Sequence, residues 1–195
     1  MHKYLKFFLL ENLDTVRRIR IGSFWKVTLL ITPWTWLSPF VFFGLHFLLN
    51  LLNTRLTLDE RLLQSIYFVI AVELATPIHA FGHILSGKLV RSAMDELLIT
   101  ATRDVNVYHG DQAKIPGYVH LVRSLGGPVI NIIVGIFCIF IARWIPPGFW
   151  AGVNNSMIST NLFFGLGGLL PVPSVDGQVI WREIINFMRN RKRPA

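Results

Sequence analysis

The feature that most constrains this chain is a set of four long apolar segments, at residues 27–52, 62–87, 119–142 and 153–173. About 20 apolar residues in a helix cross the roughly 30 Å hydrocarbon layer of a bilayer. The first segment has no Asp, Glu, Lys or Arg, and the second has only Glu73. With 52% apolar and 15% charged residues, a chain of 195 residues exposes more apolar surface than one small core can bury. We therefore predict an all-α polytopic membrane protein with about four transmembrane helices.

The positive charge, formally +8, lies mostly in three places outside these segments. Because Lys and Arg are retained on the cytoplasmic side, this pattern predicts a multi-pass integral membrane protein with both termini cytoplasmic, in the cell (inner) membrane if the source is prokaryotic. The lipid bilayer is then the partner that the charge implies, and no nucleic acid is expected. The cations are Lys3, Lys6, Arg17, Arg18, Arg20 and Lys26 before the first span, Lys88, Arg91, Arg103 and Lys114 between the second and third, and Arg182, Arg189, Arg191, Lys192 and Arg193 after the fourth.

The chain divides into a basic cytoplasmic segment, residues 1–26, and a single membrane-embedded domain, residues 27–195. Residues 11–26 mix basic side chains with Leu13, Val16 and Ile19, a spacing that fits a helix lying on the anionic inner leaflet. A solvated, charged lead-in fits the same residues equally well.

Between the second and third spans the pattern changes from helical to alternating. Leu97, Ile99, Val105 and Val107 alternate with polar residues, and Gly110 follows as a turn residue. This alternation predicts a short β-hairpin. Unpaired strand edges cannot face lipid, so we expect the hairpin at the membrane interface or against the helices.

Two histidines in the second span are candidates for metal binding. His79 and His83 are four residues apart, so a helix places both imidazoles on one face, within reach of a single ion. Catalytic zinc usually takes a third protein ligand. Asp176 is the best candidate, because it is the only acid at the irregular end of the fourth span.

Three motifs in this order resemble the site-2 protease family of intramembrane zinc metalloproteases: the His-x-x-x-His frame, Gly127-Pro128-Val-Ile-Asn131, and Pro171-x-Pro173-x-x-Asp176-Gly177. The resemblance covers about residues 62–185. It implies one Zn²⁺ per chain held by His79, His83 and Asp176, with Asn131 near the substrate or the polarised carbonyl. It also implies hydrolysis of peptide bonds within or near the membrane span of a single-span protein or a signal-peptide-like substrate.

The main departure from the family pattern is Ala80, which stands where the family has the Glu of His-Glu-x-x-His. That Glu would be the general base, so we expect this chain to be inactive although it still binds metal. An engineered knockout is our preferred explanation, and a natural pseudoprotease that binds membrane clients is the alternative. Glu73 lies two helical turns away, about 10 Å, which is too far to replace the base. Gly168 is a second departure, because the family commonly has Asn there.

The hairpin is expected to hold an unwound substrate by main-chain pairing, with Ile99 and Val107 as the residues to test. A rival interpretation is a membrane protein without catalysis, which binds a client in the same groove or ligates haem. Haem usually takes axial ligands from facing positions rather than from a pair at i and i+4. Arg123 lies near the cytoplasmic end of the third span, from where it is expected to extend to the headgroups.

Overall fold

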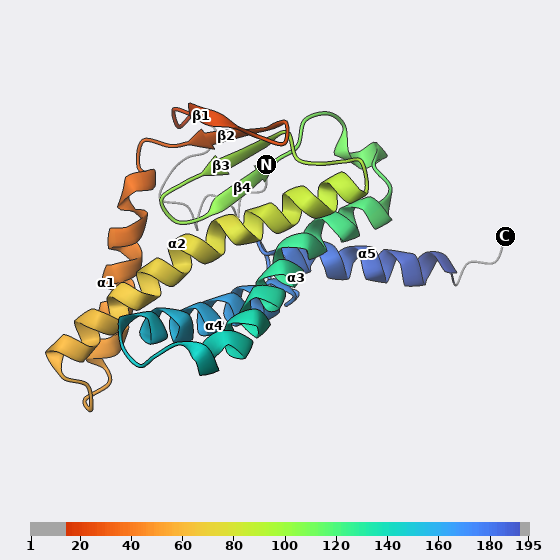
Figure 1. Cartoon of the computed structure of the whole chain (residues 1–195). Coiled ribbons are helices and arrows are strands. Elements are labelled where there is room, and N and C mark those ends of the chain that lie inside the picture. Colours follow the sequence, from red (N-terminus) through yellow and green to blue (C-terminus); the bar gives the residue numbers. More distant parts are fainter. Residues whose placement is uncertain (1–14, 192–195) are drawn as a thin grey trace.

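The computed structural model describes residues 15–191, and helices dominate it (Figure 1). The helices are α1 (Ser38–Leu51), α2 (Leu58–Leu89), α3 (Gly117–Ile141), α4 (Phe149–Gly168) and α5 (Asp176–Arg191), with short 3-10 helices at Thr35–Leu37, Gln112–Lys114 and Ala142–Trp144. The strands are β1 (Ile19–Phe24), β2 (Val27–Ile31), β3 (Glu96–Ile99) and β4 (Asp104–Val107).

Helix α2 is the central element, with the sheet on one side and α3 and α4 on the other (Figure 1). It begins in a capping box, in which Thr57 and Glu60 satisfy each other's backbone N–H groups. Small residues let α3 approach it closely: a Cβ on Gly82 or Gly126 would overlap the backbone carbonyl of the other glycine. Backbone contact of this kind fixes the position of α3 against the half of α2 that carries the two histidines.

The four strands form one sheet in the order β1-β2-β3-β4. β1 and β2 pair antiparallel, as do β3 and β4, whereas β2 and β3 run parallel because α1 and α2 connect them. The hairpin expected between the second and third spans is confirmed as β3 and β4. The chain is mostly helical, as expected, but the sheet is larger than the expected hairpin, because β3 and β4 join a second hairpin in a four-stranded sheet that packs on α2.

The first predicted span, residues 27–52, is wrong in its first part. Residues 27–31 form β2, where apolar side chains pack into the sheet, and only α1 is helical. Its 14 residues reach about 21 Å, less than a bilayer core requires. Apolar composition alone could not distinguish a buried strand from the first turns of a span.

The surface helix expected at residues 11–26 is also wrong where the structure describes it. Residues 19–24 form β1, in which Ile19 pairs with Ile31 and Phe24 pairs with Val27. The boundary expected between residues 26 and 27 falls at the tip of this hairpin, where Trp25 and Lys26 have positive φ. Residues 1–14 lie outside the described residues.

The remaining spans correspond to α2, α3 and α4, and the fourth ends at residue 168 with the irregular segment that its glycines and prolines predicted. Of the described helices, α2 and the stretch Gly117–Trp144 are long and apolar enough to cross a membrane. Only 39% and 28% of their apolar windows are buried inside the molecule. A soluble core helix would be mostly buried, so this exposed apolar surface is suited to lipid. Four transmembrane helices are therefore not confirmed, and two have support.

Candidate metal centre

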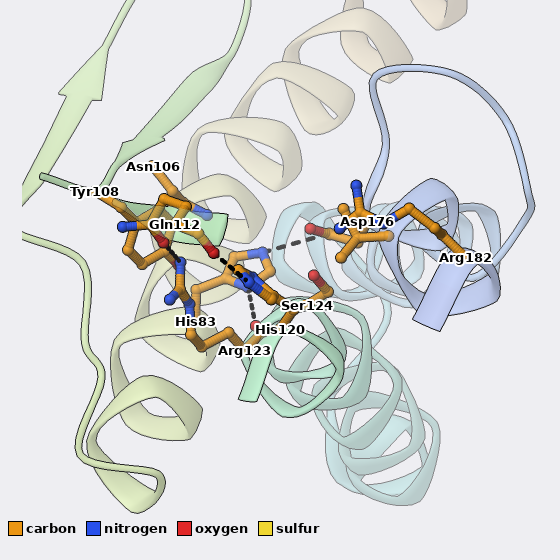
Figure 2. Close-up of a pocket in the computed structure, with 10 residues that line it drawn as sticks. His83, Asn106, Tyr108, Gln112, His120, Arg123, Ser124, Asp176 and Arg182 are labelled. Carbon is orange, nitrogen blue, oxygen red and sulfur yellow. Dashed lines mark hydrogen bonds and ion pairs between the residues drawn. The ribbon is translucent and has the colours of Figure 1, made fainter. Parts of the chain in front are cut away.

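Three ligand atoms converge between α2 and the start of α5. His79 Nε2 lies 3.0 Å from His83 Nε2 and 3.0 Å from Asp176 Oδ2, and His83 Nε2 lies 3.3 Å from the same oxygen. Figure 2 shows the His83–Asp176 contact. All three atoms lie within 4.8 Å of one another, a separation that one cation can bridge. The structure thus brings together the three residues that the sequence singled out.

The other ring nitrogens of the two histidines are held in place from outside. His79 Nδ1–H donates to Asn131 Oδ1 at 2.6 Å, and His83 Nδ1–H donates to the backbone carbonyl of Arg123 at 2.7 Å. With the proton on Nδ1, each Nε2 presents its lone pair to the centre. This is the tautomer that a metal requires, and outer hydrogen bonds of this kind orient metal ligands.

Asn131 supports His79 rather than facing open space. Its side chain is fully buried, and its amide group donates to Asn161 Oδ1 at 2.7 Å and to the Ala75 carbonyl at 3.3 Å. Asn161 donates in turn to the Met157 carbonyl. Sequence reasoning missed Asn161, although an amide inside an apolar span is a signal that could have found it.

Replacing Asn131 with Leu should weaken zinc binding by about 10–100-fold, because His79 Nδ1 loses its acceptor. Chelator competition on the purified chain would measure this. The matched control is Asn155→Leu, at an exposed position on α4, which should leave zinc affinity unchanged. Equal affinity in Asn131→Leu and the parent chain would show that His79 needs no outer partner.

Two glycines leave room for the centre. A Cβ on Gly127 would overlap Nε2 of both histidines, so only glycine fits there. A Cβ on Gly168 would lie 3.9 Å from Asp176 Oδ2. The position where the family commonly has Asn therefore faces the third ligand, and the chain lacks that polar contact.

Charge around Asp176 keeps it ionised. Burial alone would raise its pKa, but when the two Nε2 atoms carry protons, the charge on His83 and the hydrogen bonds that both histidines then donate to the carboxylate hold the pKa of Asp176 well below the usual range. An ionised carboxylate is the form that binds a metal. Arg103 lies nearby in the β3–β4 turn, and its guanidinium donates to the Ser174 carbonyl at 3.4 Å.

A second acid lies on β4. Burial and, to a smaller extent, the charge on Glu73 raise the pKa of Asp104 to about 7, against the opposing charge on Arg103. Glu73 itself accepts a hydrogen bond from the Ser38 hydroxyl at 2.7 Å. Glu73 on α2 thus has a hydrogen-bond partner on α1.

Ala80 lies in an apolar cluster between α2 and the sheet, with its side chain 3% exposed. The cluster consists of Val27, Ala80, Ile84, Met94 and Leu97, with Leu29, Ile99 and Tyr108 packed against it. A side chain at position 80 therefore points toward the sheet, beside the cavity that Tyr108 lines.

Ile99 and Val107 differ in whether they lie on an inner or an outer strand of the sheet. Ile99 lies on β3, which pairs with β2 at Ile31 and with β4 at Asp104. Ile99 therefore pairs on both sides, and its role in substrate binding stays a prediction. Val107 lies on β4, an outer strand of the sheet.

A cavity of about 300 Å³ adjoins the metal centre (Figure 2). His83 and Asp176 form one wall, and residues of β4, α3 and α5 complete it. Arg123 turns into this cavity and is 5% exposed, so the expectation that it extends to the headgroups is wrong. The lining residues are His83, Asn106, Tyr108, Gln112, His120, Arg123, Ser124, Asp176, Val179 and Arg182.

Fold and site together define a helical protein with lipid-compatible surfaces, in which one small sheet and three helices surround a His-His-Asp centre. The solved structure of the Site-2 Protease from Methanocaldococcus jannaschii has a similar fold, with a TM-score of 0.58. The match covers 87% of this chain and 72% of that one, at 17% sequence identity. No protein-family model and no curated protein matches the sequence.

Proposed function

We propose that this chain is a site-2 protease-type intramembrane metalloprotease that lacks its general base. The observation that carries the proposal is the convergence of His79, His83 and Asp176 in a fold similar to that of a site-2 protease. The outer hydrogen bonds support it because they leave both Nε2 atoms directed at Asp176, and the space at Gly127 leaves room for these atoms.

The three side chains would hold one Zn²⁺, and Asn131 and the Arg123 carbonyl would orient the imidazoles. Bound zinc supplies Lewis acidity toward a peptide carbonyl and lowers the pKa of a coordinated water. Ala80 can neither accept a proton from that water nor deliver one to the leaving amine. Zinc binding is therefore retained in this proposal, and turnover is not.

An extended substrate segment would lie beside β4. A peptide bond in a helix is protected by its own hydrogen bonds, so the substrate must unwind, and a strand edge can hold the unwound backbone. Asn106 on β4 lines the cavity that also contains His83 and Asp176, which places this strand beside the centre. The substrate class that follows is a single-span membrane protein or a signal-peptide-like segment.

The membrane arrangement is part of the proposal. The chain would be integral and multi-pass, with both termini cytoplasmic, as the distribution of Lys and Arg favours. The apolar, exposed surfaces of α2 and α3 support insertion in lipid. The engineered and natural origins of Ala80 make the same chemical predictions for this chain.

The direct test is elemental analysis of the purified full chain. We expect about one zinc per chain, and loss of that zinc in His83→Ala and in Asp176→Ala. The control is His109→Ala, because His109 is exposed and lies outside the centre. A parent chain that binds no zinc, or one that keeps it after either ligand is removed, would contradict the proposal.

A protein that binds clients without cutting them is the second candidate, and Ala80 is the observation that favours it. Zinc content does not distinguish it from a disabled protease. The Ala80→Glu variant distinguishes the two, because only a disabled protease would gain activity from it.

A further inference from the structure

Within residues 15–191, Arg123 is a buried cation without an anionic partner. Its guanidinium donates to Ser92 Oγ and to Gln112 Oε1, each at 3.2 Å, and lies 3.4 Å from the centre of the Tyr108 ring. All three partners are neutral. Its Nε–H has no hydrogen-bond acceptor, and no carboxylate in residues 15–191 lies within ion-pair distance of it.

A guanidinium that is 5% exposed is costly to keep in this state. Buried charges in proteins are normally paired, because neutral hydrogen bonds replace only part of the hydration that burial removes. The π face of Tyr108 offsets some of this cost. Retaining such a cation beside a cavity is typical of a site whose anionic partner arrives with a ligand.

The rest of the cavity also suits an anionic ligand. Tyr108, Ser124 and Asn106 provide hydroxyl and amide groups, and the guanidinium of Arg182, which is ion-paired with Glu183, lies at the rim. The only carboxylate in the lining is Asp176, which is already engaged by both histidines. A volume of about 300 Å³ admits a side chain with its flanking backbone.

We propose that this cavity is a subsite for an acidic side chain, Asp or Glu, of the peptide that reaches the metal centre, with the carboxylate bound by Arg123. The inference rests on the proposed function. A peptide fits better than a lipid phosphate, because the cavity is continuous with His83 and Asp176 and is bordered by β4, where an extended chain would lie.

The absence of a general base at position 80 allows equilibrium binding to be measured without turnover. The probes are fluorescein-labelled ten-residue Ala/Val peptides that carry one Glu at each position in turn, with a matched set that carries Gln. In fluorescence anisotropy with the full chain in neutral detergent micelles, we expect Glu to bind about 10-fold more tightly than Gln at one or two adjacent positions. Arg123→Met should reduce this ratio to about one.

Two further variants keep this result interpretable. Lys114→Gln removes an exposed cation outside the cavity and should leave the ratio unchanged. Arg123→Lys keeps the charge but loses the planar guanidinium, so the ratio should be intermediate even if Arg123→Met fails to fold. His83 is held by the Arg123 backbone carbonyl, so both Arg123 variants should keep their zinc.

Equal affinity for Glu and Gln peptides at every position, or no binding of any peptide, would overturn the subsite. Loss of the Glu preference when the parent chain is placed in anionic phosphatidylglycerol nanodiscs would also overturn it, because the occupant would then be a lipid phosphate. Zinc binding and cleavage by the Ala80→Glu chain without any Glu preference would remove the subsite and leave the proposed function standing. A Glu preference in a chain that binds no zinc would leave the carboxylate subsite standing and contradict the proposed function.

Discussion

Replacing Ala80 with Glu is expected to create peptide hydrolysis in a chain that has almost none. General-base catalysis contributes about 10²–10⁴-fold, and the rest of the centre is already in place. The measurement is the initial rate on a fluorogenic library of ten-residue apolar peptides, with the full chain in detergent micelles. Mass spectrometry of the products would then locate the cleavage site.

The matched control is Ala80→Gln, which has nearly the same size as Glu and cannot accept the proton. This control is needed because position 80 lies in an apolar cluster, which any long polar side chain would disturb. Both variants should lose a similar amount of thermal stability, and only the Glu variant should gain activity. A zinc-loaded Glu variant that binds the peptides and does not cut them would favour the client-binding alternative.

Replacing Gly127 with Ala should abolish zinc binding while the chain stays folded. The added methyl would overlap Nε2 of both His79 and His83, and metal sites tolerate displacements of only about 0.5 Å. Alanine is a better helix former than glycine by about 1 kcal/mol, so the loss would not come from a weaker α3. Zinc content after dialysis, together with the melting temperature, separates the two effects.

Gly167→Ala is the matched control, because nothing lies within 4 Å of a Cβ at that helical position. It should keep its zinc and melt at or slightly above the parent temperature. If Gly127→Ala also retained zinc, the ligands would have room to move, and the site would be less closely fitted to a metal than the distances indicate.

Local sequence patterns predicted the parts of the fold that depend on near neighbours. The alternation from Leu97 to Val107 predicted the β3–β4 hairpin, and the glycines and prolines after residue 164 predicted that α4 would end irregularly. These patterns failed at residues 19–31, where two strands were taken for a surface helix and the start of a span. β2 pairs with β1 on one side and on the other with β3, which is more than 60 residues away in the chain.

The features of the site also divide into those that the sequence predicted and those that depend on tertiary packing. The i, i+4 spacing of His79 and His83 is a property of one helix, so the sequence by itself determined that they share a face, and the resemblance supplied Asp176 as the third ligand. Other features depend on how α3, α4 and the sheet pack around α2. They are the hydrogen bond from His79 to Asn131, the position of Asn161 behind Asn131, the burial of Arg123 and the pairing of Ile99 on both sides. Tertiary structure decided these because hydrogen-bond partners and cavity walls come from segments distant in the chain, and no local pattern encodes which of those segments meet.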